Sequence, residues 1–209
     1  MVNITGICKE IEEIKAFFDA ADFNHEDEET EIEDEDLPEE YHQMGMQAFV
    51  RLQKFTIYCS IIIRKLIEAH KISDEFESEN FEILSYEKYP DAHIFWLNSH
   101  EIEKLYDMQN PTKAKINLKS LTDKIIHSFH FMPKYLWTKI NEKLADDDPE
   151  NWKNDGLEGF YFSSDKSKDK ELFYITFEGF IKVIEGVLKD NILQKTYHGD
   201  KLVLKSRKS

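Results

Sequence analysis

Three residues in the middle of the chain could hold a divalent metal ion. Asp123, His127 and His130 lie at positions i, i+4 and i+7 of a segment with helical periodicity, and residues three and four apart share one face of a helix. One carboxylate and two imidazoles are ligand types that transition metals accept. The apolar neighbours Leu121 and Ile125 favour an alternative, in which His127 is a buried histidine of a helical bundle and His130 lies at its rim.

An arginine and a histidine near the end of another helical segment could act on a phosphodiester. Arg64 precedes His70 by six positions. Histidine can move a proton to or from a ribose 2′-hydroxyl, and arginine can stabilise the charge that develops on a phosphate. Residues six apart lie about 120° apart on an ideal helix, so a shared site would need a bent helix end or a second protomer. The alternative is a surface arginine and a histidine that stabilises the negative end of the helix dipole.

The spacing of Arg64 and His70 resembles the RxxxxxH signature of HEPN domains, helical bundles in which paired protomers cleave RNA without a metal. Three stretches are similar to segments of uncharacterised bacterial proteins with HEPN-like bundles, and the likeness spans roughly residues 45–180: 63–74, 96–106 and 118–129. In this resemblance His127, within Ile-Ile-His-Ser, is the more characteristic histidine. The resemblance implies that the helices carrying Arg64 and His127 pack side by side, although no arginine lies four to six residues before His127.

Several enzyme classes have no signature in the chain. The seven glycines form no GxxxxGK[ST] or GxGxxG cluster, and the sequence has no GxSxG or HExxH motif and no HxE paired with PCxxC. Cys8 and Cys59 lie 51 positions apart, which gives neither a disulfide framework nor a cysteine zinc site. We therefore expect no cofactor, and a nucleotide-dependent or common hydrolytic enzyme is disfavoured.

Apolar residues recur mostly at intervals of three and four, which predicts an α+β fold that is predominantly α-helical. Asn98 and Glu101 have the spacing of a capping box at the start of one helix. A short strand is expected over residues 81–86, where the pattern alternates. Helices are expected over residues 7–23, 39–71, 98–110, 117–129 and 133–144.

The C-terminal part predicts a β-hairpin and a helix. Aromatic, β-prone runs at 160–163 and 171–176 flank a polar turn, a helix is expected over 180–188, and 201–205 could add an edge strand. The hairpin aromatics could stack on RNA bases, but we favour the interpretation that they pack against the helices. These aromatics are Phe160, Tyr161, Phe162, Phe173, Tyr174 and Phe177. We thus expect a single domain over 1–209, a helical bundle with a C-terminal β-hairpin and helix.

The net charge of −15 is concentrated in one run of acidic residues. The run begins at Glu26, ends at Glu40 and holds 11 carboxylates in 15 residues. Such a block repels itself and buries little apolar surface, so residues 24–40 should form an acidic solvated loop. The alternative is a surface that imitates nucleic acid or docks a basic partner. Residues 206–209 are expected to be a basic tail.

We expect a non-catalytic cytoplasmic protein that interacts with or regulates another protein, with the acidic run as the docking segment. The alternative is a HEPN-like, metal-independent endoribonuclease that acts as a homodimer, with Arg64, His70 and His127 as catalytic residues. RNA is a partner only under this alternative, and the acidic balance opposes phosphate binding. No apolar run approaches the roughly 20 residues that cross a bilayer, so no membrane contact is expected.

Overall fold

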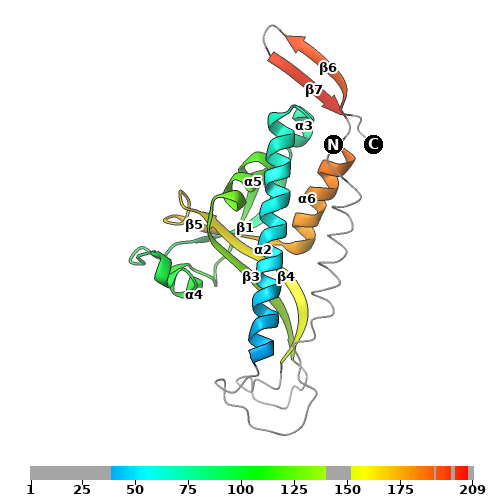
Figure 1. Cartoon of the computed structure of the whole chain (residues 1–209). Coiled ribbons are helices and arrows are strands. Elements are labelled where there is room, and N and C mark those ends of the chain that lie inside the picture. Colours follow the sequence, from blue (N-terminus) through cyan, green and yellow to red (C-terminus); the bar gives the residue numbers. More distant parts are fainter. Residues whose placement is uncertain (1–38, 140–151, 191, 199–200, 207–209) are drawn as a thin grey trace. The chain divides into compact units, whose positions relative to one another are not determined.

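The computed structural model describes residues 39–139, 152–190, 192–198 and 201–206 (Figure 1). The helix expected over 7–23 and nearly all of the acidic segment 24–40 lie outside these residues. Contacts within the chain group it into two compact units. The first unit comprises Met1–Gln53 and Pro133–Glu158, and the second comprises Lys54–Met132 and Gly159–Ser209. The expected single domain over 1–209, with its basic tail at 206–209, stays a prediction.

A five-stranded antiparallel sheet is the main element of the described chain. The order of its strands is β2-β1-β5-β4-β3, so β2 and β3 are the outer strands. The central strands pair in a defined register, with Leu84 opposite Tyr174 and Tyr161 opposite Tyr174. The strands are β1 (Asn80–Glu87), β2 (Thr112–Asn117), β3 (Ser128–Lys139), β4 (Trp152–Ser164) and β5 (Glu171–Thr176).

Several helices expected within the described residues are shorter than the sequence predicts or are replaced by a strand. Those of the described chain are α2 (Glu39–Glu68), α3 (Asp74–Glu77), α4 (Ile102–Leu105), α5 (Leu118–Ile126) and α6 (Phe177–Lys189), with a short 3-10 turn η2 (Trp96–Asn98). The prediction of a predominantly helical bundle is wrong, because the structure has about as much strand as helix and the five-stranded sheet carries most of the contacts. The HEPN-like resemblance is wrong for the same reason, since it implies a bundle of helices without such a sheet.

The largest error concerns the chain after α5. The helix expected over 117–129 ends at Ile126, and His127 follows as its C-cap residue. The helix expected over 133–144 is strand β3 throughout its described part. Phe129 and Phe131 are spaced two apart, as aromatic residues on one face of a strand are. Proline interrupts a ladder least at an edge, and Pro133 lies in an outer strand.

Five other elements confirm the sequence-based expectations. The strand expected over 81–86 is β1, and the two aromatic runs form the paired strands β4 and β5. The long periodic segment after the acidic run is α2, and the last periodic segment is α6. By contrast, the helix expected over 98–110 is reduced to η2 and α4, because Asn98 ends a 3-10 turn instead of opening a helix.

The C-terminal strands form a separate hairpin within the second unit. Strand β6 (Ile192–His198) pairs with β7 (Lys201–Ser206) in a two-stranded sheet. The strand expected over 201–205 therefore exists, but it does not extend the main sheet. A backbone N–H of this hairpin, that of Leu204, donates to Asp74 Oδ2 of α3 at 3.3 Å. Asp190 at the end of α6 accepts hydrogen bonds from the Ser73 N–H and hydroxyl at 2.6 and 2.9 Å.

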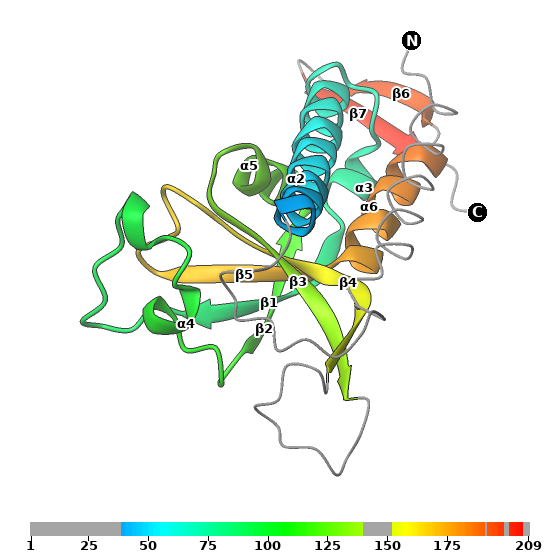
Figure 2. The same ribbon diagram turned by 60° about the horizontal axis from the view of Figure 1, so that its bottom comes forward.

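The two faces of the sheet are covered differently. Directly opposite residues of an antiparallel pair share a face, so Tyr161, Tyr174 and Leu84 lie on one side. Phe160 and Phe162 point to the other side, where Phe160 contacts Phe180 of α6 with ring centroids 5.5 Å apart. Helices α5 and α6 lie on one side of β1 and β5 (Figure 2). Cys59 is buried in α2.

Helix α6 shows how its sequence produces its place in the fold. The Thr176 hydroxyl caps its start by accepting from the Gly179 N–H at 3.0 Å. Its outer side carries two i, i+4 ion pairs, of which Lys182 with Glu178 is the shorter at 2.7 Å.

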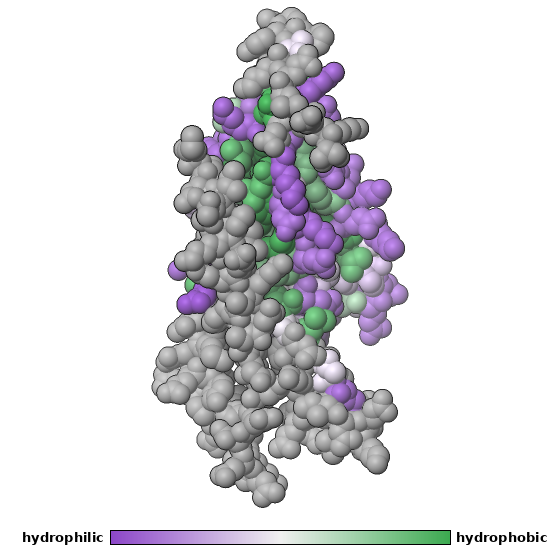
Figure 3. Space-filling view, turned by 90° about the vertical axis from the view of Figure 1, so that its right-hand side faces the viewer, coloured by the Kyte–Doolittle hydropathy of each residue, from purple (hydrophilic) through white to green (hydrophobic). Residues whose placement is uncertain are grey.

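On the described part of the face in Figure 3, hydrophilic and apolar side chains lie next to one another. Within the described residues, no helix has the length and apolarity needed to cross a bilayer.

Candidate functional site

Arg64 lies on α2 and pairs with acidic side chains of the second unit. Its Nε is 3.1 Å from Asp123 Oδ1 on α5, and a terminal nitrogen is 3.7 Å from Glu68 Oε1. An ion pair therefore joins α2 to α5 through Asp123, and His127 takes no part in it. No hydrogen bond or ion pair among the described residues joins Arg64 to His70 or His127.

His70 follows α2 and has a backbone role. Its φ of 52° is in the left-handed region, which residues other than glycine seldom adopt. The His70 N–H donates to Ile67 O at 3.0 Å and the Lys71 N–H donates to Leu66 O at 2.8 Å. These are the two hydrogen bonds of a Schellman helix end, with His70 at the position that glycine most often occupies. Its imidazole is exposed to solvent.

The three candidate metal ligands do not share a helix face. Asp123 lies on α5, His127 is exposed at the C-cap, and His130 is on strand β3. The i, i+4, i+7 spacing is interrupted where α5 ends. Among the described residues, no group of three or more His, Cys, Asp or Glu side chains could hold a metal ion.

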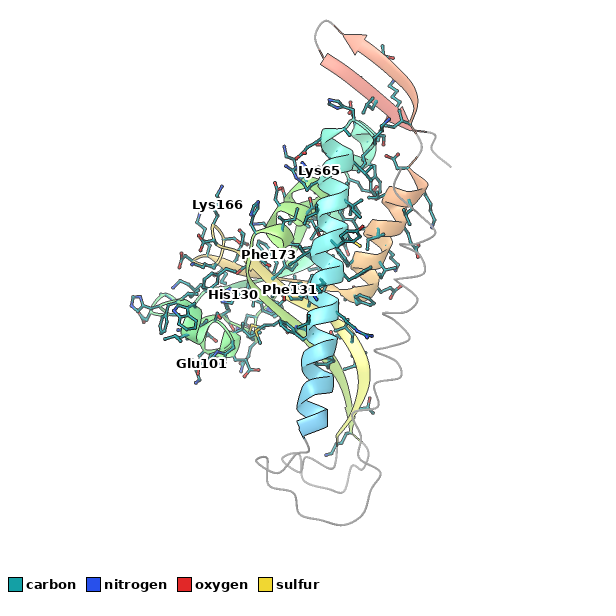
Figure 4. The ribbon with its side chains drawn as sticks, viewed as in Figure 1. Lys65, Glu101, His130, Phe131, Lys166 and Phe173 are labelled. Carbon is teal, nitrogen blue, oxygen red and sulfur yellow. The ribbon has the colours of Figure 1, made fainter. Side chains whose placement is uncertain are left out.

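The structure instead brings His130 together with Tyr106 and Ser163 in a buried polar cluster. His130 is 1% exposed, and Tyr106 and Ser163 are fully buried. His130 Nδ1 is 2.7 Å from Ser163 Oγ and 3.4 Å from the Tyr106 hydroxyl, which donates to Lys168 O at 2.8 Å. His130 lies inside the molecule beside its β3 neighbour Phe131 (Figure 4). We call Tyr106, His130 and Ser163 the buried polar cluster.

Burial determines the protonation of this cluster. Burial, assisted by the charge of Lys168, lowers the pKa of His130 to about 4, so the imidazole is neutral near pH 7. Burial also raises the pKa of the Tyr106 hydroxyl, which keeps its proton. His130 Nε2 has no hydrogen-bond partner among the described residues. A neutral histidine beside a serine can accept its proton, but Ser163 presents no surface that a substrate could reach.

Sequence reasoning missed most of this cluster. Tyr106 follows α4, His130 is on β3, and Ser163 is near the end of β4, so no short motif joins them. The hairpin aromatics, by contrast, meet the favoured expectation. All six are at most 9% exposed and therefore pack in the interior, as expected: Phe160, Tyr161, Phe162, Phe173, Tyr174 and Phe177.

The most unusual exposed feature is a run of three apolar side chains at η2. Phe95, Trp96 and Leu97 are 49%, 75% and 57% exposed. Singly exposed apolar residues are common on proteins, whereas adjacent large ones mark binding surfaces. We call these three residues the apolar knob. Glu101, a few residues further on, lies in the segment that projects from the sheet (Figure 4).

Hydrogen bonds fix the backbone that presents the apolar knob. Asn98 Oδ1 accepts from the Phe95 N–H at 3.0 Å, and Asn98 Nδ2 donates to His93 O at 2.8 Å. The Ser99 hydroxyl donates to Trp96 O at 2.9 Å. Before the knob, Lys88 Nζ donates to Ala92 O at 2.6 Å. These hydrogen bonds hold the backbone of the knob, although its side chains face solvent.

Buried residues on both sides of the knob anchor this segment to the sheet. Ile94 and Ala92 pack against a cluster that contains Ile102 and Leu105 of α4. The rest of that cluster is Tyr106, which follows α4, and four residues of the sheet: Tyr86, Tyr161, Leu172 and Tyr174. Ile94 is partly buried, whereas the next three side chains point outward. The segment that carries the apolar knob is thus packed against the sheet and α4.

Comparisons with known proteins add no further assignment. The chain matches no protein-family model, no curated protein and no solved structure.

Proposed function

We propose that the chain is a non-catalytic protein-binding module that docks through the apolar knob. The observation that carries this proposal is the exposure of Phe95, Trp96 and Leu97 on a backbone held by Asn98 and Ser99. Exposing three large apolar side chains is unfavourable in water, because full burial of one such fully exposed side chain gains about 1.5–3 kcal/mol, of which these three would gain the part that corresponds to their exposed area. A partner with a complementary apolar pocket would supply that burial.

The composition of the knob suits a central contact of an interface. Tryptophan is enriched among residues that dominate binding energy, and aromatic residues are enriched in interfaces generally. Because Asn98 and Ser99 already order the backbone, less conformational entropy is lost on binding. His93, His100 and Glu103 are exposed nearby and would form a polar rim. The acidic run from Glu26 to Glu40 stays a second proposal for partner docking.

Two single variants test the role of the apolar knob. Trp96→Ala removes the most exposed apolar side chain, and Tyr58→Ala removes a comparable exposed aromatic, 54% exposed, on α2. The tagged wild-type chain and both variants would be expressed in their native cells and subjected to quantitative proximity labelling. We expect a set of neighbours that Trp96→Ala loses and Tyr58→Ala keeps. Identical neighbour sets for all three chains would overturn the proposal.

A further inference from the structure

A groove of about 620 Å³ lies on the second unit, beside the outer strand β2. Leu84 of β1 and Tyr174 of β5, which lie opposite each other on one face of the sheet, are among the residues that line it. Its rim contains Lys113 and Lys115 of β2 and Lys182 of α6. We call this the basic groove.

The charge of the basic groove is opposite to that of the whole chain. Three lysines and one glutamate, Glu82, line it, whereas the chain has a net charge of −15. Lys113, Lys115 and Lys182 are all exposed. A local positive surface on an acidic protein attracts acidic ligands and disfavours basic ones.

The groove adjoins a strand that can accept another strand. β2 is the last strand of the sheet order, and its pairing within the described residues is with β1. Among the described residues, no strand pairs with the other side of its backbone, which therefore offers N–H and C=O groups to a further strand. In the register with β1, Lys113 lies opposite Leu84 and Lys115 opposite Glu82, so both lysines are on one face of the sheet.

We propose that β2 and the basic groove bind an extended acidic peptide, which adds to the sheet as a further strand. Backbone hydrogen bonds to β2 would supply affinity, and alternate side chains would supply specificity. Because Lys113 and Lys115 are two residues apart, the peptide needs acidic residues at every second position to contact both. The peptide residues between these acidic positions would point to the opposite face of the sheet, where Ala114 and Ile116 of β2 lie, and should be apolar. The partner is thus a protein segment in which acidic and apolar residues alternate.

The competing interpretation is that the lysines keep other strands away. Charged residues, especially lysine, commonly protect edge strands from unwanted pairing. That interpretation predicts no ordered complex with any peptide, whereas strand addition predicts dependence on the order of residues in the peptide. The two interpretations are therefore separable by one pair of peptides.

The test uses a fluorescein-labelled peptide of alternating glutamate and valine, eight residues long, and a peptide of the same composition with four glutamates before four valines. Fluorescence anisotropy measures the affinity of each for the full chain. We expect the alternating peptide to bind about tenfold or more tightly than the block peptide. Equal affinity, or no binding of the alternating peptide, would overturn the proposal.

Two charge-matched variants locate the site. Lys113→Glu/Lys115→Glu should weaken binding of the alternating peptide about tenfold or more. Lys65→Glu/Lys189→Glu makes the same change in net charge at exposed lysines of α2 and α6 and should change the affinity little. Equal weakening by both variants would show binding to net charge alone and would overturn the proposal.

Hydrogen exchange gives a readout that does not depend on charge. The alternating peptide should slow exchange of amides in β2, residues 112–117, and unchanged exchange there with bound peptide would overturn strand addition. Trp96→Ala should bind this peptide as the wild-type chain does, because the apolar knob takes no part. The loss of proximity-labelled proteins in Trp96→Ala tests the apolar knob, and failure of peptide binding tests the basic groove. The two results are therefore independent.

Discussion

Tyr106 and Trp96 lie ten positions apart in the sequence and have opposite surroundings. The fully buried Tyr106 carries a hydroxyl that is hydrogen-bonded in the interior, and Trp96 is 75% exposed although its indole is mostly apolar. A buried polar group is retained where its hydrogen bonds are made, and an exposed large apolar group suggests a missing partner. We therefore expect the buried polar cluster to contribute to stability, whereas binding is the role proposed for the apolar knob.

Truncation of Tyr106, the buried residue of this pair, should have the largest effect on stability. Tyr106→Ala should reduce the free energy of unfolding by about 3–5 kcal/mol, because it leaves a cavity and removes the donor to Lys168 O. Urea denaturation followed by circular dichroism measures the loss. A change below about 1 kcal/mol would show that Tyr106 is not packed as described.

The pH dependence of stability should depend on His130. Its pKa of about 4 in the folded chain lies below the ordinary value of 6.5. Between these values the unfolded state binds more protons, so stability falls as the pH falls from 6.5 toward 4. The free energy of unfolding at pH 7.5 minus that at pH 4.5 should be about 2–3 kcal/mol smaller in His130→Asn, which cannot titrate. An equal difference in both chains would contradict a buried neutral His130.

A smaller change isolates the hydroxyl of Tyr106 from its ring. Tyr106→Phe keeps the packing and leaves Lys168 O and His130 Nδ1 without that hydroxyl. We expect a loss of about 1–2 kcal/mol in the free energy of unfolding. A loss as large as that of Tyr106→Ala would mean that the hydrogen bonds, more than the ring, hold this segment.

Two histidines, His130 and His70, provide a second comparison of a buried and an exposed residue. His130 is buried, whereas His70 is exposed and contributes through its backbone at the end of α2. His70→Gly should stabilise the chain by about 0.5–1 kcal/mol, because glycine adopts positive φ without strain. Thermal unfolding would show a raised Tm; a lowered Tm would mean that the imidazole itself contributes to stability.

The smallest expected effect on stability belongs to the apolar knob. Trp96→Ala should change the free energy of unfolding by no more than about 0.5 kcal/mol, since the side chain is mostly in solvent. The same urea denaturation measures it. A loss of several kcal/mol would show that Trp96 packs within the chain and would remove the contrast with Tyr106.

Local patterns predicted the elements whose neighbours in sequence are also their neighbours in space. The hairpin of β4 and β5 and the amphipathic helix α6 are of this kind, since each has its pattern within one short segment. β2 was not predicted, because Lys113 and Lys115 on an edge strand give only a weak β signal. β3 was missed because Leu121, Ile125 and Phe129 continue a helical spacing across the turn at His127.

The candidate sites depended on long-range packing and were less predictable. Pairing of His130 with Ser163 requires the register of strands 33 positions apart, which helical spacing around Asp123 concealed. The exposure of Phe95, Trp96 and Leu97 could not be inferred either, because the same residues could have lain in a core. Their exposure is explained by the residues that hold the segment, Ile94 by packing and Asn98 by hydrogen bonds, and these roles appear only in the folded chain.

The buried thiol of Cys59 makes opening of the second unit measurable by chemistry. An alkylating reagent attacks a thiolate only when it can reach the sulfur, and Cys59 is 3% exposed on α2. Its alkylation rate in the native protein therefore reports how often this part of α2 separates from its surroundings. Mass spectrometry of the peptide that contains Cys59 would follow this rate on its own, before and after a partner occupies the surface of the second unit.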